Sequence, residues 1–367
     1  MEVLNFMNTN SNWEEVLTKP PYCVTVKRDE DYILLKYNQL SSDFSIPIVQ
    51  ECRGSIFYQN KDGKYECVCR AFDKFFNQGE GNAAEIDWYS VVVEEKVDGS
   101  LMKVWYHNNQ WHVSTNSNIN AYKAEVGETS WTFGRLFDNA IKNIFPSAFF
   151  NGLDKNMVHM FELVSPRSMC TVAYPETRLY YLGSRNMNTM MECKVYPAIM
   201  STAEILYPKV YELYTLDCCQ KYINTMTKDE EGFVIRDKHY NRIKLKSPAF
   251  LMAFHMNNNG IITTKRVIKM IQNEQIDDFL AYCPHRKEIV EEVLAKLNNL
   301  AARMDETWQL CADVAAKCDR EVFACYISKL PYKDYLYNKY DNHDLRSMNY
   351  ILTRTMPCIL RMLEGSK

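Results

Sequence analysis

The spacing of apolar residues changes near residue 250, and this change limits the folds open to the chain. From about residue 22 to 250, short alternating apolar runs are separated by turn residues, which is typical of antiparallel strands. Expected strands lie at 32–37, 55–58, 111–114, 178–182 and 232–236. One helix is expected from about Ser130 to Ile144, and another is expected to begin near Ser201. The pattern predicts an α+β domain built on antiparallel sheets.

After Pro248 the spacing becomes helical. Over 263–318 apolar residues recur every three or four positions, charged residues fill the other faces, and the pattern continues over 320–364. We expect the boundary at the polar run 257–260. The predicted domains are residues 1–255, an α+β domain, and residues 256–367, an all-α domain.

Composition narrows the class of protein. A hydrophobic content of 47% indicates a globular chain, and no run is apolar for long enough to span a membrane. The first residues lack the layout of a signal peptide, so a cytoplasmic protein with reduced thiols at its thirteen cysteines is expected. The net charge of −3 argues against a protein that coats nucleic acid through bulk charge, but it allows an enzyme with a locally basic cleft.

The segment Lys96-Val97-Asp98-Gly99-Ser100 carries the main chemical signal. A lysine followed after one residue by Asp-Gly-Ser is the arrangement in which lysine acts as a nucleophile towards a nucleotide phosphate. Residues 88–93 predict a strand that leads to the lysine, and Asp-Gly predicts a tight reversal into a second strand at 101–106. Taken alone, the segment is weak evidence, because it is more typical of an ordinary hairpin at a sheet edge.

Further short segments occur upstream and downstream in a definite order. They are Glu51-Cys52-Arg53-Gly54, Asp73-Lys74-Phe75-Phe76-Asn77, Phe161-Glu162-Leu163-Val164, Glu231-Gly232-Phe233-Val234-Ile235 and Lys244-Leu245-Lys246-Ser247. Each has an ordinary explanation as a turn, an exposed carboxylate or the solvent face of a strand. Their occurrence together and in this order is much harder to explain in that way.

In this order the segments resemble the covalent nucleotidyltransferase superfamily of ligases and capping enzymes. Within it, the chain resembles the bacteriophage RNA ligase 1 family, because of the ECRG and KFFN elements and a helical tail in place of an OB-fold. The resemblance covers about residues 30 to 250. It implies an antiparallel-sheet nucleotidyltransferase domain (ATP-grasp-like ligase) followed by an all-α domain that recognises RNA.

The resemblance also implies roles for the basic residues. Lys96 would attack the α-phosphate of ATP as a neutral amine. The like charges of Lys244 and Lys246 would lower its pKa and stabilise the departing pyrophosphate. Arg53 and Lys74 would help to hold the triphosphate.

Carboxylates, glycines and one aromatic residue complete the implied site. Glu231 is the first candidate ligand for Mg²⁺, with Mn²⁺ as a substitute, and Glu162 is expected at the ribose or the metal. Gly99 and Gly232 would allow a close backbone approach to the nucleotide. Phe76 is expected to line the nucleotide pocket, although a position in the core would explain it equally well.

One segment departs from the family pattern. Where family members carry an arginine or lysine after the lysine strand, this chain has residues 114–118, without a positive charge. Asn116 can hydrogen-bond a ribose hydroxyl or a phosphate there, but it cannot neutralise charge.

The sequence therefore predicts an ATP-dependent RNA ligase that joins 5′-phosphate and 3′-hydroxyl ends through a covalent lysyl-AMP, in the repair of RNA such as tRNA. Its partners would be ATP and single-stranded or nicked-loop RNA, with no membrane and no obligate protein partner, and the family implies a viral source. Alternatives are a DNA ligase or an RNA-capping guanylyltransferase of the same superfamily. A non-catalytic RNA-binding protein that has kept the fold is a further alternative.

Overall fold

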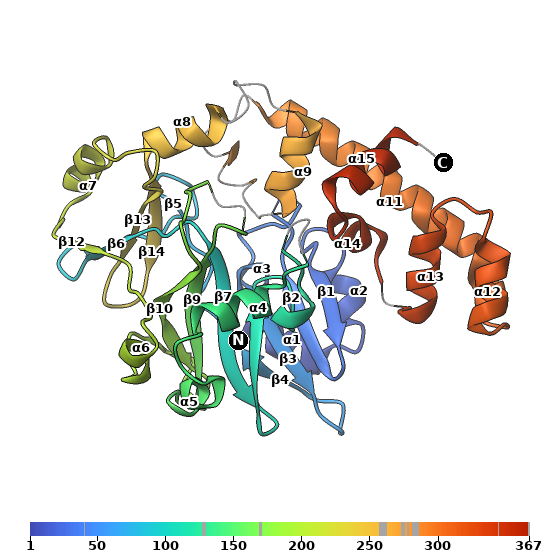
Figure 1. Cartoon of the computed structure of the whole chain (residues 1–367), viewed down its shortest axis with the longest axis horizontal. Helices are drawn as coiled ribbons and strands as arrows, with labels where there is room; N and C mark the ends of the chain where they lie inside the picture. Colours follow the sequence, from blue (N-terminus) through green and yellow to red (C-terminus); the bar gives the residue numbers. More distant parts are fainter. Residues whose placement is uncertain are drawn as a thin grey trace. The chain divides into compact units, whose positions relative to one another are not determined.

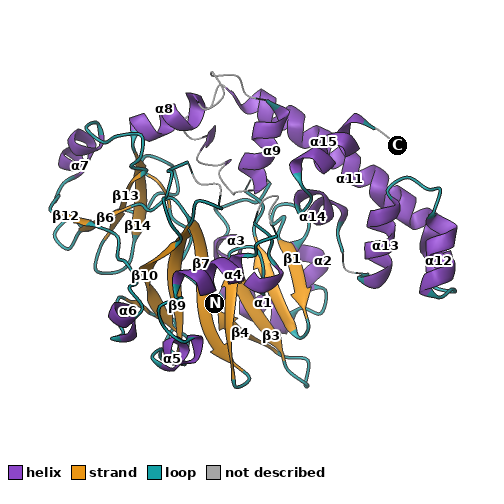
Figure 2. Ribbon diagram, viewed as in Figure 1, coloured by secondary structure: helices purple, strands orange, loops and turns teal. Residues whose placement is uncertain are grey.

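The chain divides into two compact units, residues 1–260 and 261–367. A computed structural model describes residues 1–365 apart from 40, 127–129, 169–170, 257–262, 273–275, 277–278, 281–285 and 344 (Figure 1). The polar run 257–260, where the boundary was expected, lies outside the described residues. All described strands belong to the first unit, and the described elements of the second are helices (Figure 2). This is the α+β architecture that the apolar spacing predicts.

Four antiparallel strands form the first sheet, in the order β1-β2-β3-β4. Their bounds are β1 (Thr25–Asp29), β2 (Tyr32–Lys36), β3 (Arg53–Gln59) and β4 (Tyr65–Cys69). Three short helices accompany this sheet, namely α1 (Glu2–Thr9), α2 (Trp13–Leu17) and α3 (Pro47–Glu51). Val3 and Leu17 of the first two helices share one core with Ile33 and Phe57 of the sheet.

The second sheet has the order β11-β10-β9-β7-β8. Its strands are β7 (Ser100–His107), β8 (Gln110–Thr115), β9 (Met157–Val164), β10 (Arg178–Asn186) and β11 (Glu192–Cys193). The accompanying helices are η1 (Ala121–Lys123), α4 (Phe133–Ala140), α5 (Pro146–Asn151) and α6 (Ile199–Thr202). Phe137, Phe149 and Phe161 form an aromatic core, with ring centroids 5.9–6.2 Å apart.

The expected helix 130–144 is shorter in the structure. The hydroxyl of Thr132 accepts a hydrogen bond from the backbone N–H of Arg135, so this residue caps the helix and α4 begins at Phe133. The helix expected near Ser201 is only the single turn α6.

The third sheet has the order β12-β6-β13-β14-β5, with β5 parallel to β14 and the other pairs antiparallel. Its strands are β5 (Phe76–Asn77), β6 (Val92–Glu95), β12 (Val210–Tyr211), β13 (Gly232–Arg236) and β14 (Arg242–Lys246). Two helices flank β13 and β14 in the chain, namely α7 (Leu216–Ile223) and α8 (Pro248–Met256). Val93, Phe233, Ile235 and Ile243 are buried in one core with Ile223 of α7.

The lysine segment does not form the hairpin that its Asp-Gly pair predicts. β6 pairs with β12 and β13, whereas β7 pairs with β8 and β9, so Asp98 and Gly99 carry the chain from the third sheet to the second. The strand expected at 88–93 begins only at Val92, because the preceding residues turn around Asp87, whose carboxylate accepts the hydroxyl of Ser90 at 2.9 Å. The hairpin prediction was wrong because a glycine also suits a crossing where a Cβ has no space.

The second unit is organised around one long helix. Its described helices are α9 (Thr264–Gln272), α11 (Lys287–Ala315), α12 (Arg320–Ile327), α13 (Lys333–Asp341), α14 (Ser347–Leu352) and α15 (Met356–Glu364). Tyr335 of α13 is fully buried and donates to Asp305 of α11 at 2.8 Å. Tyr340 stacks on Phe323 and donates to the carbonyl of Cys318, so these two tyrosines pack within the unit. Among the described helices, none combines the length and the apolar character needed to cross a membrane.

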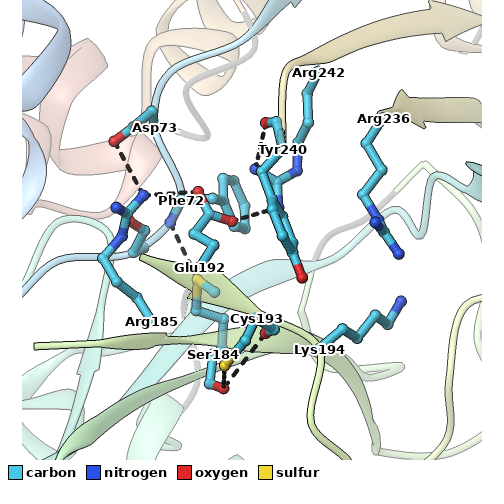
Figure 3. Close-up of polar contacts among 12 residues, drawn as sticks. Phe72, Asp73, Ser184, Arg185, Glu192, Cys193, Lys194, Arg236, Tyr240 and Arg242 are labelled. Atoms are coloured by element: carbon cyan, nitrogen blue, oxygen red, sulfur yellow. Dashed lines mark hydrogen bonds and ion pairs between the residues drawn. The ribbon is translucent and has the colours of Figure 1, made fainter. Parts of the chain in front are cut away.

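A network of buried ion pairs joins the second and third sheets (Figure 3). The carboxylate of Glu192, 5% exposed, lies 2.7 Å from the guanidinium of Arg185 on β10 and 2.5 Å from that of Arg242 on β14. The carboxylate of Glu94 on β6 accepts from Lys194 and from Arg236. Glu192 thus connects cations from the second and third sheets, and Glu94 connects Arg236 of the third sheet with Lys194, directly after β11.

We expect Glu192→Gln to lower the free energy of unfolding by about 3 kcal/mol, because it removes the carboxylate that pairs with the buried guanidinium of Arg242 and leaves Arg185 with Asp73 alone. Urea unfolding followed by tryptophan fluorescence would measure the change. Glu66→Gln is the matched control, since Glu66 pairs with His107 but is 57% exposed. Equal stability of the two variants would contradict a structural role for the network.

Candidate active site

Lys96 lies directly after β6 and is tied to the beginning of β13. Its backbone N–H donates to the carbonyl of Gly232 at 2.8 Å. Its Nζ donates to Oε2 of Glu231 at 2.7 Å, and its side chain is 21% exposed. The amine is therefore held in one place but can still be reached from solvent, as a nucleophile requires.

Glu231 bridges two lysines. Its second oxygen, Oε1, lies 2.7 Å from Nζ of Lys246, and both of these side chains are buried. Burial by itself would raise the pKa of Glu231, but the positive charges of Lys246 and Lys96 outweigh this effect and lower the pKa. Three groups that the sequence places far apart thus form one charged cluster.

Gly232 and Gly99 are required by close approaches within the protein. Gly232 has φ +138°, and a Cβ there would lie 2.1 Å from the carbonyl oxygen of Leu245. A Cβ on Gly99 would lie 2.6 Å from the carbonyl oxygen of Leu163 and 2.8 Å from Cγ of Glu162. Gly232 therefore allows β13 to lie close to β14, and Gly99 allows the segment after the lysine to lie close to β9, in addition to any approach of a nucleotide.

Two further carboxylates surround the lysine. Burial raises the pKa of Glu162 on β9 to about 8, an effect that Lys96 opposes and that the charges of Glu231 and Asp98 increase. Burial and the charge of Glu231 likewise raise the pKa of Asp98 to about 6. The three carboxylates lie close together, so the negative charge of one disfavours ionisation of the others.

Asp98 is a site residue that the sequence analysis missed. Its Oδ2 accepts backbone N–H groups from Thr171 at 2.6 Å and Val172 at 2.9 Å, so it anchors the segment between β9 and β10 beside the lysine. The only sequence signal for Asp98 is its position within the lysine motif, where the Asp-Gly pair predicts a turn.

Arg53, at the start of β3, has an unused donor. Its guanidinium lies 4.5 Å from the centre of the Phe72 ring, and its positive charge lowers the pKa of Glu162. Within the described part of the chain, its buried Nη1 has no hydrogen-bond partner. Arg53 is thus close to the carboxylate cluster with one donor available.

Asn116 lies against the ECRG segment. A Cβ on Gly54, where φ is +70°, would lie 2.3 Å from the carbonyl oxygen of Asn116 and 2.7 Å from its Oδ1. The fully buried Lys103 donates its Nζ to the carbonyl of Gly54. Lys103 therefore supplies a positive charge near a segment in which the sequence analysis found none.

Lys74 lies among three aromatic rings. Its Nζ is 4.0 Å from the ring centre of Phe44, 4.8 Å from that of Tyr37 and 5.0 Å from that of Phe76. Phe76 is 7% exposed and pairs with Ile243 through β5 and β14. Phe76 is thus part of the core, and its ring also lies beside the amine of Lys74. No local sequence signal indicated Tyr37 or Phe44.

Lys244 shares one face of β14 with Lys246, because strand residues two apart point to the same side. It pairs with Val234 of β13 and Asn77 of β5, and it is half-buried. The structure therefore brings Lys96, Glu231 and Lys246 into direct contact, with Lys244 on the same face of the sheet as Lys246.

A sequence model of the RNA ligase family matches residues 51–250. The chain belongs to the RNA ligase family. The match includes every candidate site residue discussed above except Tyr37 and Phe44, and it confirms the family that the order of the motifs indicates.

Two relatives and one solved structure are similar to this RNA ligase family member. A protein of Autographa californica nuclear polyhedrosis virus, named for polynucleotide kinase and RNA ligase activities, is 32% identical over 72% of this chain but only 39% of its own length. An RNA ligase of Rhodothermus phage RM378 is 22% identical over 75% of this chain and 76% of the relative. An archaeal ATP-dependent RNA ligase has 14% identity and a TM-score of 0.46, with 82% of each chain covered.

We expect the stability of the free protein to fall as the pH rises from about 4.5 to about 8, since the folded state keeps a proton on Glu162 that the unfolded chain releases. The slope from this one group would be at most about 1.4 kcal/mol per pH unit. Glu162→Gln, which stays neutral, should flatten the dependence and exceed the parent in stability above pH 8. Denaturant unfolding across this pH range would measure it.

Glu176→Gln is the control for this experiment, because Glu176 is 56% exposed and pairs with Arg178 at the surface. This variant should keep the pH dependence of the parent. A Glu162→Gln profile parallel to that of the parent would show that Glu162 does not hold a proton in the folded state.

Proposed function

We propose that the chain is an ATP-dependent RNA ligase that joins 5′-phosphate and 3′-hydroxyl ends through a lysyl-AMP intermediate on Lys96. The observation that carries this proposal is the partly exposed amine of Lys96 beside the buried Glu231–Lys246 pair. Membership of the RNA ligase family supports the choice of RNA as the polynucleotide.

In the first step, Nζ of Lys96 attacks the α-phosphorus of ATP, a P–N bond forms, and the bond to pyrophosphate breaks. The amine must lose a proton before it attacks. Its Nζ donates to Glu231, so nucleotide binding must weaken this contact. Lys244 and Lys246 would stabilise charge on the departing pyrophosphate.

The ends of the nucleotide have different candidate partners. Arg53, with its unused donor, and Lys74 are suited to the triphosphate. Asn116 and Glu162 are suited to the ribose hydroxyls as hydrogen-bonding groups. Glu162 can donate as well as accept at neutral pH, because its pKa of about 8 keeps it largely protonated.

Mg²⁺, or Mn²⁺ in its place, would be held by the carboxylate oxygens of Glu231 and, after loss of its proton, of Glu162. A divalent cation there would supply charge neutralisation at the phosphates. In the described part of the chain, no three acidic, histidine or cysteine side chains gather as a metal site.

In the later steps, AMP moves from Lys96 to the 5′-phosphate of RNA, and a 3′-hydroxyl then attacks that phosphate and releases AMP. Broken single-stranded RNA, such as a cleaved tRNA loop, is the proposed substrate, and the role is RNA repair. The helical unit would recognise the shape of the RNA. DNA ligases and capping enzymes, which normally carry an OB-fold there, are disfavoured because the described residues of this unit are helical.

Incubation with α-labelled ATP and Mg²⁺ followed by denaturing electrophoresis tests the covalent step. The parent should carry label, and Lys96→Ala should carry none, because the other amine at Glu231, that of Lys246, is only 6% exposed whereas Lys96 is 21% exposed. Lys123→Ala is the control, since Lys123 also pairs with a carboxylate but is 64% exposed. Label retained by Lys96→Ala would remove the central claim.

A second test separates the chemical steps. Lys244→Ala and Lys246→Ala should slow lysyl-AMP formation by about 100-fold or more, and should slow the sealing of pre-adenylylated RNA much less, because pyrophosphate leaves only in the first step. Lys238→Ala, in the turn between β13 and β14 and paired with Asp87, should change neither rate. Equal losses in both assays would count against a role towards pyrophosphate.

A DNA ligase would seal nicked DNA in preference to RNA, and a capping enzyme would accept label from GTP instead of ATP. A non-catalytic RNA-binding protein would bind RNA without any label, even after pyrophosphate treatment to remove AMP already attached.

A further inference from the structure

The ring of Tyr240 lies between two guanidinium groups on the hairpin of β13 and β14. Its centre is 5.2 Å from Cζ of Arg236 and 5.4 Å from Cζ of Arg242. Lys194 and Arg236 come together at the carboxylate of Glu94. Figure 3 shows the ends of Lys194, Arg236 and Tyr240 directed towards one region. We call Lys194, Arg236, Tyr240 and Arg242 the cation–tyrosine cluster.

Positive charge exceeds negative charge around this cluster. Its three cations face two carboxylates, because Glu94 pairs with Lys194 and Arg236, and Glu192 pairs with Arg242. Glu192 also pairs with Arg185, which has a second partner in Asp73 at 3.2 Å. Burial lowers the pKa of Lys194; Glu94 opposes this shift, and the charges of Arg236 and Arg242 add to it. Crowded cations of this kind favour an anionic ligand.

The backbone of Tyr240 has a conformation that is unusual for a residue with a large side chain. Tyr240 has φ +63°, a conformation that glycine or asparagine usually adopts in such turns. Asp237 holds the turn, since its carboxylate accepts the backbone N–H groups of His239 and Asn241. A large aromatic residue at this position is costly for the fold, and strain of this kind is concentrated at functional sites.

Two more tyrosines lie beside the cluster. Tyr196 is 56% exposed and Tyr207 is 38% exposed, and their ring centres are 5.0 Å apart. Burial raises the pKa of Tyr196, and the charges of Glu94 and Arg236 also act on it, so this pair borders the cluster. Exposed aromatic faces beside cations are the combination that single-stranded nucleic acids bind, through stacked bases and neutralised phosphates.

The cluster shares one face of β6 with the nucleophile. Glu94 precedes Lys96 by two residues, so both lie on the same side of the strand, about 7 Å apart along it. Lys194 and Arg236 bind Glu94 and therefore lie on that side as well. An RNA strand whose end lies at Lys96 would therefore extend across the cluster.

We propose that the cation–tyrosine cluster binds a single-stranded segment of the RNA substrate, with a backbone phosphate beside Arg236 and Lys194 and an unpaired base against the tyrosine rings. This inference rests on the proposed function, since it assigns the RNA strand to a surface next to Lys96. The site is distinct from the groups assigned to the triphosphate, Arg53, Lys74, Lys244 and Lys246.

Tyr240→Gly and Arg236→Gln test the assignment. Glycine accepts the backbone conformation without strain, so Tyr240→Gly should be at least as stable as the parent to thermal unfolding. It should nevertheless bind a short 5′-phosphorylated oligouridylate about tenfold more weakly in fluorescence anisotropy, through the loss of one stacked base. Arg236→Gln should reduce the slope of log affinity against log salt by about 0.7, the value for one phosphate contact to a single strand.

The controls match each change. Asn109→Gly removes a side chain at φ +60° from another hairpin turn, and Arg28→Gln removes a guanidinium that pairs with one carboxylate and lies 5.9 Å from the centre of the Trp13 ring. Neither should alter RNA affinity or its salt dependence. Tyr240→Phe, which keeps the ring, should bind nearly as tightly as the parent.

Labelling with α-labelled ATP in the absence of RNA separates this inference from the proposed function. Loss of RNA affinity with lysyl-AMP formation retained is the expected result. If both variants bind RNA like the parent, the cluster is only structural and the inference is overturned. If the variants lose labelling by the same factor as RNA affinity, the cluster serves the nucleotide. That result would also overturn the inference. A parent protein that takes no label would contradict the proposed function, while the RNA affinities would still test the cluster.

Discussion

The bridge from Glu231 to Lys96 and Lys246 is the interaction on which the rest of the site depends. A buried carboxylate is costly unless it is paired, and here two ammonium groups at 2.7 Å compensate for its burial. The bridge joins the end of β6, the start of β13 and the end of β14. It therefore holds the lysine in place.

The same principle operates at the other end of the third sheet. Glu94 and Glu192 each hold two cations together, as Glu231 holds two lysines. At the cation–tyrosine cluster three cations, Lys194, Arg236 and Arg242, face the two carboxylates Glu94 and Glu192. An excess of positive charge suits a polynucleotide phosphate there.

Much of the fold was predictable from local pattern. Strand β13 has the predicted bounds, and β2, β3, β8 and β10 begin or end within a few residues of the predictions. Turn chemistry was less informative, because Asp-Gly is compatible with a hairpin and also with a crossing between sheets. The path at Gly99 is decided by the carbonyl of Leu163, which leaves no space for a Cβ. That carbonyl belongs to a strand more than sixty residues away.

The sequence by itself determined the family and made Lys96 the candidate nucleophile, because each motif is a contiguous segment and the order of the motifs is readable without a structure. Only the tertiary structure decided which charged and polar groups lie in contact. The anchoring role of Asp98, the buried Lys103 and the placement of Tyr240 between two guanidinium groups all depend on contacts between residues distant in the chain or on a backbone angle that the residue type disfavours. Local periodicity carries no information about such contacts, since it records only which face of an element is buried.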